Sequence, residues 1–376
     1  MLMLDRARSR CDHHHPGLLK ALTDLPLPER EAPTAPGVGL FRAHDGPGLL
    51  LPTELGGAGA DPVDAVQVMR ALSTCSPSLG AAATMHHFSV AALLGLIGDE
   101  VRVPPAQLDL VTRIAPENLL VASGWAEGTS GQDLLEPAVT AVPTDGGYLI
   151  SGSKKPCSLA RSMDLLTASV AIPGEQPPIG VIVIPADTPG ISRHPFWSSQ
   201  VLAGAESDEV RLTDVFVPEQ LMLRTRPEDP MVMLDLQNAG FTWFQMLITS
   251  VYVGAAGALV ERALARGRGS VTDRAEMIVQ LESSAALVEG VARALRDGID
   301  VDVAVAAVLT ARFAAMRSLR AATDLATELL GGNAFFRDSE VALLLSATRA
   351  IAFHPPSRTG AAESLVSLHA PDAAAT

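Results

Sequence analysis

The chain has 376 residues, of which 48% are hydrophobic and 19% are charged, so it can bury large cores and should fold into two or three domains. Its formal net charge of −14 argues against nucleic acid and against anionic membranes as partners, because both attract basic surfaces. The three cysteines, Cys11, Cys75 and Cys157, are odd in number and far apart, which excludes a disulfide framework. With no continuous apolar leader at the N-terminus, these features predict a cytoplasmic protein.

The first 45 residues carry Pro, His and Arg without a clear period, so we expect a frayed start. The tract His13–His15, which follows Cys11, is expected to be solvated, with adventitious metal binding as the alternative. No zinc-type spacing occurs, and no metal site is predicted. From Pro62 to about Leu120, apolar residues recur at helical spacing, which predicts an α-helical domain.

Between about Asn118 and Pro218 the pattern changes to short runs of β-forming residues separated by turn signals. The pair Asp145-Gly146 lies between two such runs and predicts a hairpin. A small β domain is therefore expected here. The expected strands are Pro137–Val142, Tyr148–Ser151, Leu165–Ile172, Gly180–Ile184 and Glu209–Leu212.

After Pro230 the helical period returns, through Leu281–Arg296 and then Val301–Leu330, which the following two glycines should end. One apolar run, Trp243–Val260, reaches the minimum length of a membrane span. It is rich in Ala and Gly and continues directly into Glu261-Arg262, so we expect a buried bundle helix instead. The patterns predict three domains, at residues 1–117 (α-helical), 118–225 (β) and 226–376 (helical bundle).

Short motifs along the chain resemble those of the acyl-CoA dehydrogenase family, in the same order and with similar gaps. They are Gly48–Gly59, Gly124–Asp133, Gly147–Lys155, Thr213–Pro218 and Glu328–Asn333. The likeness is specific in spacing, although Ala126, Gly128 and Gln132 replace the family's usual Thr, Pro and Ser. The resemblance implies an α+β multidomain fold with an N-terminal α-helical domain, a middle β-barrel or sandwich domain and a C-terminal four-helix bundle.

The resemblance also implies that FAD lies between the β domain and the bundle, and that its adenine end reaches a neighbouring subunit. A homodimer or homotetramer is therefore expected. Trp125 and Ala126 would lie against the flavin, with Gly131 and Gln132 near its phosphates. The hydroxyl of Ser158 would reach the flavin N5 region; the alternative is a turn hydroxyl bonded to its own backbone.

For the pyrophosphate, counting back from Gln280, itself matched to the family's site, favours Arg268, with Arg266 close behind. A planar guanidinium suits this role because it donates two hydrogen bonds at once, whereas the alternative is a charge that complements a helix end. The segment that meets the neighbouring subunit's FAD is matched by Glu328, Gly331 and Gly332. Glu328 in place of the usual Gln puts a negative charge close to phosphate.

The family's catalytic carboxylate is absent from this chain. An ungapped match from the Gly331 motif puts Pro355 at the position of that Glu and Ser357 at the position of the cofactor-binding Thr. Some members carry the base on the helix that here includes Phe244 and Gln245, and that region has no carboxylate either.

Two sets of histidines are candidates for the missing base. His354 is adjacent to the vacant position, and its imidazole ordinarily titrates near pH 6.5, which suits a base or an acid. A His before two prolines also caps turns, which is the structural alternative. His86-His87, in the domain that covers the family's substrate channel, is the second candidate.

The resemblance implies an FAD-dependent oxidoreductase acting on CH–CH groups. The expected reaction is α,β-desaturation of an acyl thioester on CoA or an acyl carrier protein, in specialised metabolism. A decarboxylative variant is attractive because loss of CO2 forms the carbanion without a base. Electron-transfer flavoprotein or O2 would be the acceptor. Two alternatives remain open: a flavin-dependent monooxygenase on the same fold, and a degenerate, non-catalytic partner subunit.

Overall fold

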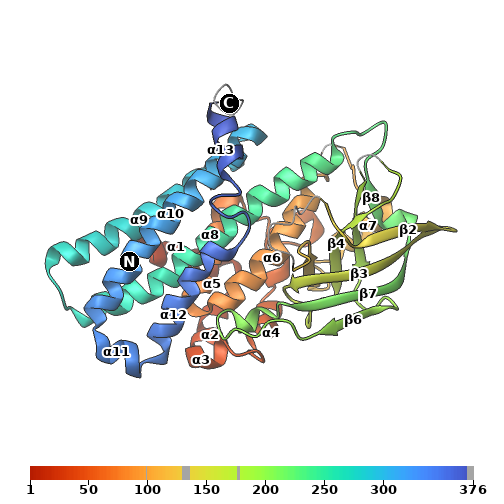
Figure 1. The fold of residues 1–376 in the computed structure, drawn as a ribbon. Helices are drawn as coiled ribbons and strands as arrows, with labels where there is room; N and C mark the ends of the chain where they lie inside the picture. Colours follow the sequence, from red (N-terminus) through yellow and green to blue (C-terminus); the bar gives the residue numbers. More distant parts are fainter. Residues whose placement is uncertain (99, 129–135, 176–177, 371–376) are drawn as a thin grey trace.

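The computed structural model describes residues 1–98, 100–128, 136–175 and 178–370 (Figure 1). Helices come first, a sheet follows, and a helical bundle ends the chain, which confirms the fold class expected from the sequence. The N-terminal helices are α1 (Leu2–His14), α2 (Leu18–Thr23), α3 (Leu27–Arg30), α4 (Gly37–Ala43), α5 (Pro62–Cys75), α6 (Pro77–Leu94) and α7 (Pro105–Thr112). The C-terminal helices are α8 (Val232–Arg266), α9 (Val271–Arg296), α10 (Val301–Leu330), α11 (Gly332–Arg337), α12 (Ser339–Arg349) and α13 (Ala362–His369).

The expectation of a frayed N-terminus is wrong. Helix α1 packs along α5 and buries Met3, Leu4 and Ala7 together with Cys11, so one apolar face is present in a segment whose other residues are polar. The histidine tract is solvated only at His13, which is exposed: His14 Nε2 lies 3.0 Å from Asp64 Oδ2, and His15 is fully buried. Among the described residues no group of His, Cys, Asp or Glu is arranged to hold a metal ion.

Helices α5 and α6 begin where the sequence provides caps. Asp61 accepts a hydrogen bond from the backbone N–H of Asp64, and Ser76 accepts one from that of Leu79; each cap precedes a proline at the first helical position. Both helices are buried; α6 contacts strand β1 on one side and α8 on the other (Figure 1), and α5 packs on α6, α8 and α9. They therefore connect the two halves of the molecule.

The strands form one sheet in the order β6-β7-β3-β2-β4-β5-β8, with β1 paired parallel to β4. The turn Asp145-Gly146 joins β2 to β3 in antiparallel register, as the sequence predicted. The expected runs correspond to parts of β2, β3, β4, β5 and β7, whereas β6 and β8 were not anticipated. The strands are β1 (Val121–Gly124), β2 (Thr140–Thr144), β3 (Gly147–Cys157), β4 (Leu165–Ala171), β5 (Ile179–Pro185), β6 (Ile191–His194), β7 (Asp208–Pro218) and β8 (Met222–Arg224).

The bundle consists of α8, α9, α10 and α12 packed against one another. Of the described residues, only α8 forms a helix long and apolar enough to cross a membrane, and 89% of its most apolar window is buried inside the protein. This burial supports the expected core helix. A capping box between Ser270 and Asp273 starts α9, and α10 ends at Gly331, whose φ of +82° favours glycine.

A buried ion pair ties α5 to the bundle. Arg70 is fully buried, and its Nη1 donates to Glu289 Oε1 at 2.9 Å. Glu289 Oε2 accepts a second hydrogen bond from Arg293, at 2.7 Å. Burial alone would raise the pKa of Glu289, but the charge of Arg70 outweighs it and holds that pKa below its ordinary value.

Replacing Glu289 with Ala should therefore destabilise the fold by about 3–5 kcal/mol, because the charge of Arg70 would remain buried without an anion. Urea unfolding measures this change. Glu276→Ala is the matched control, since Glu276 is exposed on the same helix and should change the free energy of unfolding by less than about 0.5 kcal/mol. Equal effects of the two substitutions would contradict the assignment.

Candidate functional site

The loop that follows β1 carries the first of the expected flavin contacts. Gly124 ends the strand against β4, where a side chain would meet Ala168 Cβ and the carbonyl oxygen of Thr167 at 3.0 Å. Trp125 comes next and is partly buried, and within the described chain its indole Nε1 is buried without a hydrogen-bond partner. The carbonyl of Ala126 accepts from Lys155 N at 2.8 Å. The indole N–H is therefore a donor that a bound ligand can satisfy.

A buried ion pair fixes the base of this loop. Lys154 is fully buried on β3, and its Nζ donates to Glu127 Oε1 at 2.6 Å. Glu127 also accepts from the backbone N–H groups of Ala138 and Val139, at 2.8 and 3.1 Å. The pair therefore ties the residues on both sides of the loop to the sheet. Gly131 and Gln132, expected near phosphate, lie outside the described residues.

Ser158 lies directly after β3, and it is buried. Its Oγ is 2.9 Å from Ser207 Oγ, so the hydroxyl does not turn back to its own backbone as the alternative interpretation required. A hydroxyl has one donor and two acceptor sites, so a second partner can still be bound. The contact of Ser158 with flavin N5 stays a prediction.

Of the residues matched to the pyrophosphate site, Arg268 and Gly331 lie next to each other. Arg268 lies in the exposed turn between α8 and α9, and its Nη1 lies 3.5 Å from where a Cβ on Gly331 would be. Glu328 and Gly332 are exposed at the same end of α10. Gln280 is nine residues into α9, about 14 Å along its axis, and bonds to Glu276 Oε1 at 2.6 Å. Their contacts with FAD remain predictions.

Arg268→Ala should weaken flavin retention more than Arg320→Ala does. The first loses a planar donor next to Gly331, whereas the second removes an exposed side chain on α10 whose nearest acid, Asp324, is 3.8 Å away. The bound flavin per chain after gel filtration measures the difference. Equal occupancy in both variants would leave Arg268 as an ordinary surface charge.

His354 follows a short 3-10 helix, η5 (Ala350–Phe353), and its ring lies against α8. Its Nε2 is 2.5 Å from the hydroxyl of Tyr252. The ring of Phe244 lies 5.9 Å from the His354 ring, edge-on, and the ring of Phe88 on α6 lies edge-on to Phe244 at 5.4 Å. An imidazole and three aromatic rings from three different parts of the chain therefore form one continuous group.

The protonation of this group differs from the expectation based on an ordinary histidine. Burial, followed by the positive charge of Arg312, lowers the pKa of His354 to about 3. Burial also raises the pKa of Tyr252. The phenol therefore keeps its proton and donates it to Nε2, so we assign the imidazole proton to Nδ1, which has no acceptor within the described chain. The expected titration of His354 near pH 6.5 is corrected: the ring is neutral there, and its Nδ1 is a donor.

Arg312 holds the turn that carries His354. It is 1% exposed on α10, and Nη2 donates to the carbonyl oxygens of Ile351, at 3.1 Å, and of His354. Its Nη1 donates to Gln245 Oε1 and, at 2.9 Å, to the carbonyl of Pro355. Gln245 Nε2 donates to the same Pro355 carbonyl at 2.9 Å. The position matched to the family's catalytic Glu is thus occupied by a backbone carbonyl that accepts two buried donors.

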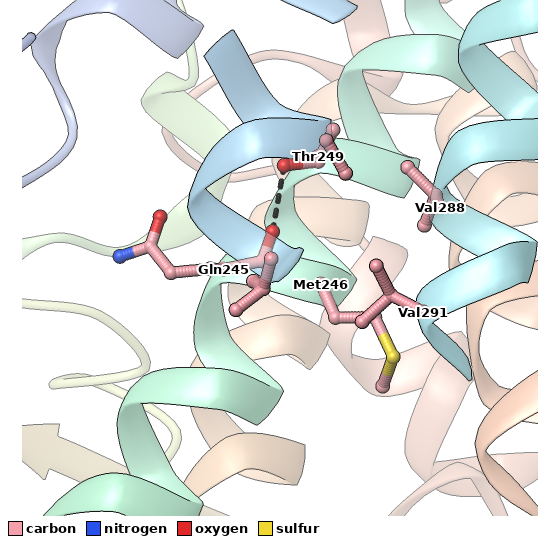
Figure 2. Close-up of a pocket in the computed structure, with 7 residues that line it drawn as sticks. Gln245, Met246, Thr249, Val288 and Val291 are labelled. Carbon is pink, nitrogen blue, oxygen red and sulfur yellow. Dashed lines mark hydrogen bonds between the residues drawn. The ribbon is translucent and has the colours of Figure 1, made fainter. Parts of the chain in front are cut away.

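A small hollow lies behind Gln245, among α8, α9 and α10 (Figure 2). It is lined by Met246, Val288 and Val291, and the amide of Gln245 points away from it. Thr249 donates to the carbonyl of Gln245 at 2.6 Å. The hollow does not admit a water molecule, so it belongs to the packed bundle core.

The other candidates are His86, His87 and Ser357. His86 is fully buried: Nδ1 accepts from Val121 N and Nε2 donates to the carbonyl of Pro47, both at 3.0 Å. Neither of its nitrogens is left for a substrate, and His87 is fully buried beside it. Ser357 is exposed, and its Oγ accepts from Gly360 N at 3.0 Å. The contact of Ser357 with cofactor stays a prediction.

Sequence reasoning missed Tyr252 and Arg312. Each had a signal: Tyr252 is one of two tyrosines and lies inside the apolar run of α8, and Arg312 interrupts the apolar stretch of α10. An isolated polar side chain at a core position requires a partner, and these two meet at the turn that carries His354.

The residues present fit a flavin. The unpaired indole N–H of Trp125 and the buried hydroxyl of Ser158 offer donors at the ends of neighbouring sheet segments, where a polar cofactor would satisfy them. The three-part fold and this site define a flavin-dependent oxidoreductase.

The acyl-CoA dehydrogenase C-terminal domain family matches residues 236–354. The chain is 57% identical over 368 residues to isobutylamine N-hydroxylase of Streptomyces viridifaciens, covering 97% of each. The chain belongs to the acyl-CoA dehydrogenase family.

Solved structures agree on the fold. FMN-bound TdsC, a dibenzothiophene monooxygenase from Paenibacillus sp. A11-2, superposes with a TM-score of 0.82 at 21% identity, covering 97% of each chain. The FAD complex of PigA superposes with a TM-score of 0.79 at 16% identity, covering 97% of this chain and 96% of that one. The family uses FAD, which confirms the expected class of cofactor.

Proposed function

We propose that this chain is a flavin-dependent monooxygenase that N-hydroxylates a small primary aliphatic amine. The overall reaction is RNH2 + O2 + 2 e⁻ + 2 H⁺ → RNHOH + H2O, in which reduced flavin supplies the electrons. The similarity to isobutylamine N-hydroxylase along nearly the whole chain supports this choice of reaction. FAD is the cofactor we expect, with FMN as the alternative that flavin analysis distinguishes. This proposal takes up the monooxygenase alternative in place of desaturation.

The observation that carries the proposal is that Pro355 stands at the position matched to the family's catalytic Glu, where it provides no base. Desaturation requires a group that removes the α-proton of a thioester, and a placed base contributes about 10²–10⁴-fold to the rate. Here the Pro355 carbonyl accepts from Arg312 and Gln245, and neutral His354, with a pKa of about 3, is a weak base. Oxygen transfer to an amine requires no α-proton removal, because the nitrogen lone pair is the nucleophile.

The side chains have distinct tasks in this reaction. When bound, reduced flavin together with O2 supplies an electrophilic oxygen atom. Trp125 and Ser158 would hold and orient the ring system through the indole N–H and the hydroxyl. Tyr252 keeps His354 in the tautomer that carries its proton on Nδ1, and this N–H would be available to donate a hydrogen bond beside the bound flavin. Phe88 and Phe244 would exclude water from the amine and its short alkyl group.

Supplying the protein with flavin, a separate NAD(P)H-dependent flavin reductase and isobutylamine under 18O2 tests this function. We expect N-hydroxyisobutylamine containing one 18O atom, detected by mass spectrometry. The matched comparison is an anaerobic titration of the flavin-loaded protein with isobutyryl-CoA. Oxygen consumption that does not depend on the amine, together with reduction of the flavin by the thioester, would overturn the proposal. Desaturation would then again be the favoured reaction. Purified protein that retains no flavin under any condition would support the non-catalytic partner.

A further inference from the structure

Arg312 is a buried cation that has no anionic partner among the described residues. Its hydrogen bonds go to three carbonyl oxygens of the 351–355 turn and to the side-chain amide of Gln245. Its Nε is buried without a partner in the described chain. Arg70, the other arginine of comparable burial, is paired with Glu289. The two buried arginines are therefore held in different ways.

Such an arrangement is costly, because taking an ion out of water without a counter-ion costs several kcal/mol. Burial accordingly lowers the pKa of Arg312 to about 10, which still leaves it charged at neutral pH. Carbonyl dipoles satisfy the hydrogen-bonding groups of the guanidinium but leave its net charge in place. The site therefore contains one permanent positive charge next to His354.

We propose that Arg312 is a positioning residue of this site that fixes the 351–355 turn and, through its uncompensated charge, keeps the amine substrate as the free base. The inference rests on the proposed N-hydroxylation. An alkylamine free in water ordinarily has a pKa near 10.4, so only about 1 in 10³ molecules carries the reactive lone pair at pH 7. A second positive charge is disfavoured beside Arg312, so an amine entering the site has to lose its proton.

The groups facing this site do not cancel the charge. Helix α8 contributes the protonated Tyr252, the ring of Phe244 and the neutral amide of Gln245. The turn contributes backbone carbonyls and neutral His354, and α10 contributes Phe313, whose ring centre is 5.7 Å from the guanidinium carbon. None of these groups is an anion, so within the described chain no neighbouring negative charge offsets the charge of Arg312 at His354.

The charge state of His354 provides a readout that does not depend on catalysis. We would titrate 15N-labelled histidine side chains by NMR in the flavin-free and flavin-loaded protein, and assign His354 with His354→Gln. The variants are Arg312→Met, which removes the charge, Arg312→Lys, which keeps it, and Gln245→Glu, which places a carboxylate against it. Arg320→Met, eight residues further along α10 and exposed, is the matched control.

Wild type, Arg312→Lys and Arg320→Met should keep the His354 ring neutral to below about pH 5, whereas Arg312→Met and Gln245→Glu should raise its titration by one pH unit or more. If Arg312→Met does not fold, the difference in His354 titration between Gln245→Glu and Arg312→Lys is enough to test the role of the charge. The same His354 titration in all variants would overturn the assigned role of the charge.

The pH dependence of amine turnover gives the second readout. In Gln245→Glu the acidic limb of kcat, which reports the protonation of the bound amine, should move up by about one pH unit; at a pH below that limb this is about a tenfold loss that higher pH restores. An equal loss in Arg312→Lys and Gln245→Glu at every pH, with no shift of the limb, would reduce Arg312 to a structural residue. Absence of amine turnover in wild type would instead refute the proposed function, while the NMR titration would still test Arg312.

Discussion

Lowering the pH from about 7.5 to about 4.5 should remove most of the stability of this fold, through three buried histidines. Burial lowers the pKa of His15 and of His86 to about 4 and that of His87 well below its ordinary value. Because their folded pKa values are depressed, these groups leave the stability intact above pH 6.5. The loss occurs as the pH falls from about 6.5 toward about 4, where the unfolded chain binds protons that the folded chain does not.

The expected slope is steep. These three groups, each of which must take up a proton on unfolding, give roughly 4 kcal/mol per pH unit within this window, and His354, whose pKa is about 3, adds to the slope; a typical total stability is about 5–15 kcal/mol. Urea unfolding at several pH values measures the slope. A slope corresponding to less than one proton would contradict the assignment.

His87→Phe provides the matched variant. Both ring nitrogens of His87 are buried without a hydrogen-bond partner among the described residues, and the ring packs between Phe41 and His86, at 5.8 and 4.9 Å. A phenyl ring keeps the packing and removes the groups that cannot be satisfied. The variant should therefore be at least as stable as wild type at about pH 7.5 and should lose stability less steeply in acid. A variant less stable than wild type at neutral pH would indicate a hidden partner for His87.

His354→Ala should lower the rate of amine hydroxylation by about 10²-fold or more while flavin binding remains intact. The variant removes the Nδ1–H donor and leaves Trp125 and Ser158 unchanged. Rapid-mixing measurements of product formation, with reduced flavin and O2 supplied separately, check the rate, and the flavin spectrum checks binding. Because the pKa of His354 lies near 3, the wild-type rate should show no step near pH 6.5 that belongs to this residue.

Two comparisons isolate the role of the imidazole. His369→Ala changes an exposed histidine at the end of α13 and should leave the rate as it is. Tyr252→Phe keeps the ring and removes only the hydroxyl that selects the tautomer, so it should reproduce part of the loss. If His354→Ala hydroxylates as fast as wild type, the imidazole has no part in the chemistry and the site lies elsewhere on the flavin.

The sequence alone was sufficient for the order of helical and β segments, because hydrophobic periodicity and turn signals are local properties. Local sequence is enough to predict three of these features, without knowledge of any packing partner. They are the Asp145-Gly146 turn, the uninterrupted helical period of Val301–Leu330 and the helix end at the glycines after it. Helix α1 was not predicted because its apolar face is short and lies among charged residues. Only packing against α5 shows that this face is buried.

The candidate site could be predicted only in part from the sequence. The sequence located His354 and revealed that the carboxylate was missing, since both facts depend on residue identity at a motif. The sequence could not indicate that Tyr252, about a hundred residues earlier, bonds to that imidazole, or that Arg312 on another helix holds its turn. Those contacts join α8, α10 and η5, and they exist only once the bundle has closed.

The sequence by itself therefore determined the family, the order of helices and strands and the loss of the usual base. Tertiary structure alone decided the protonation states. An isolated histidine titrates near 6.5, and it is burial beside a guanidinium that moves His354 far below that value. The physical reason is that secondary structure depends on neighbours in the chain, whereas desolvation and charge depend on neighbours in space.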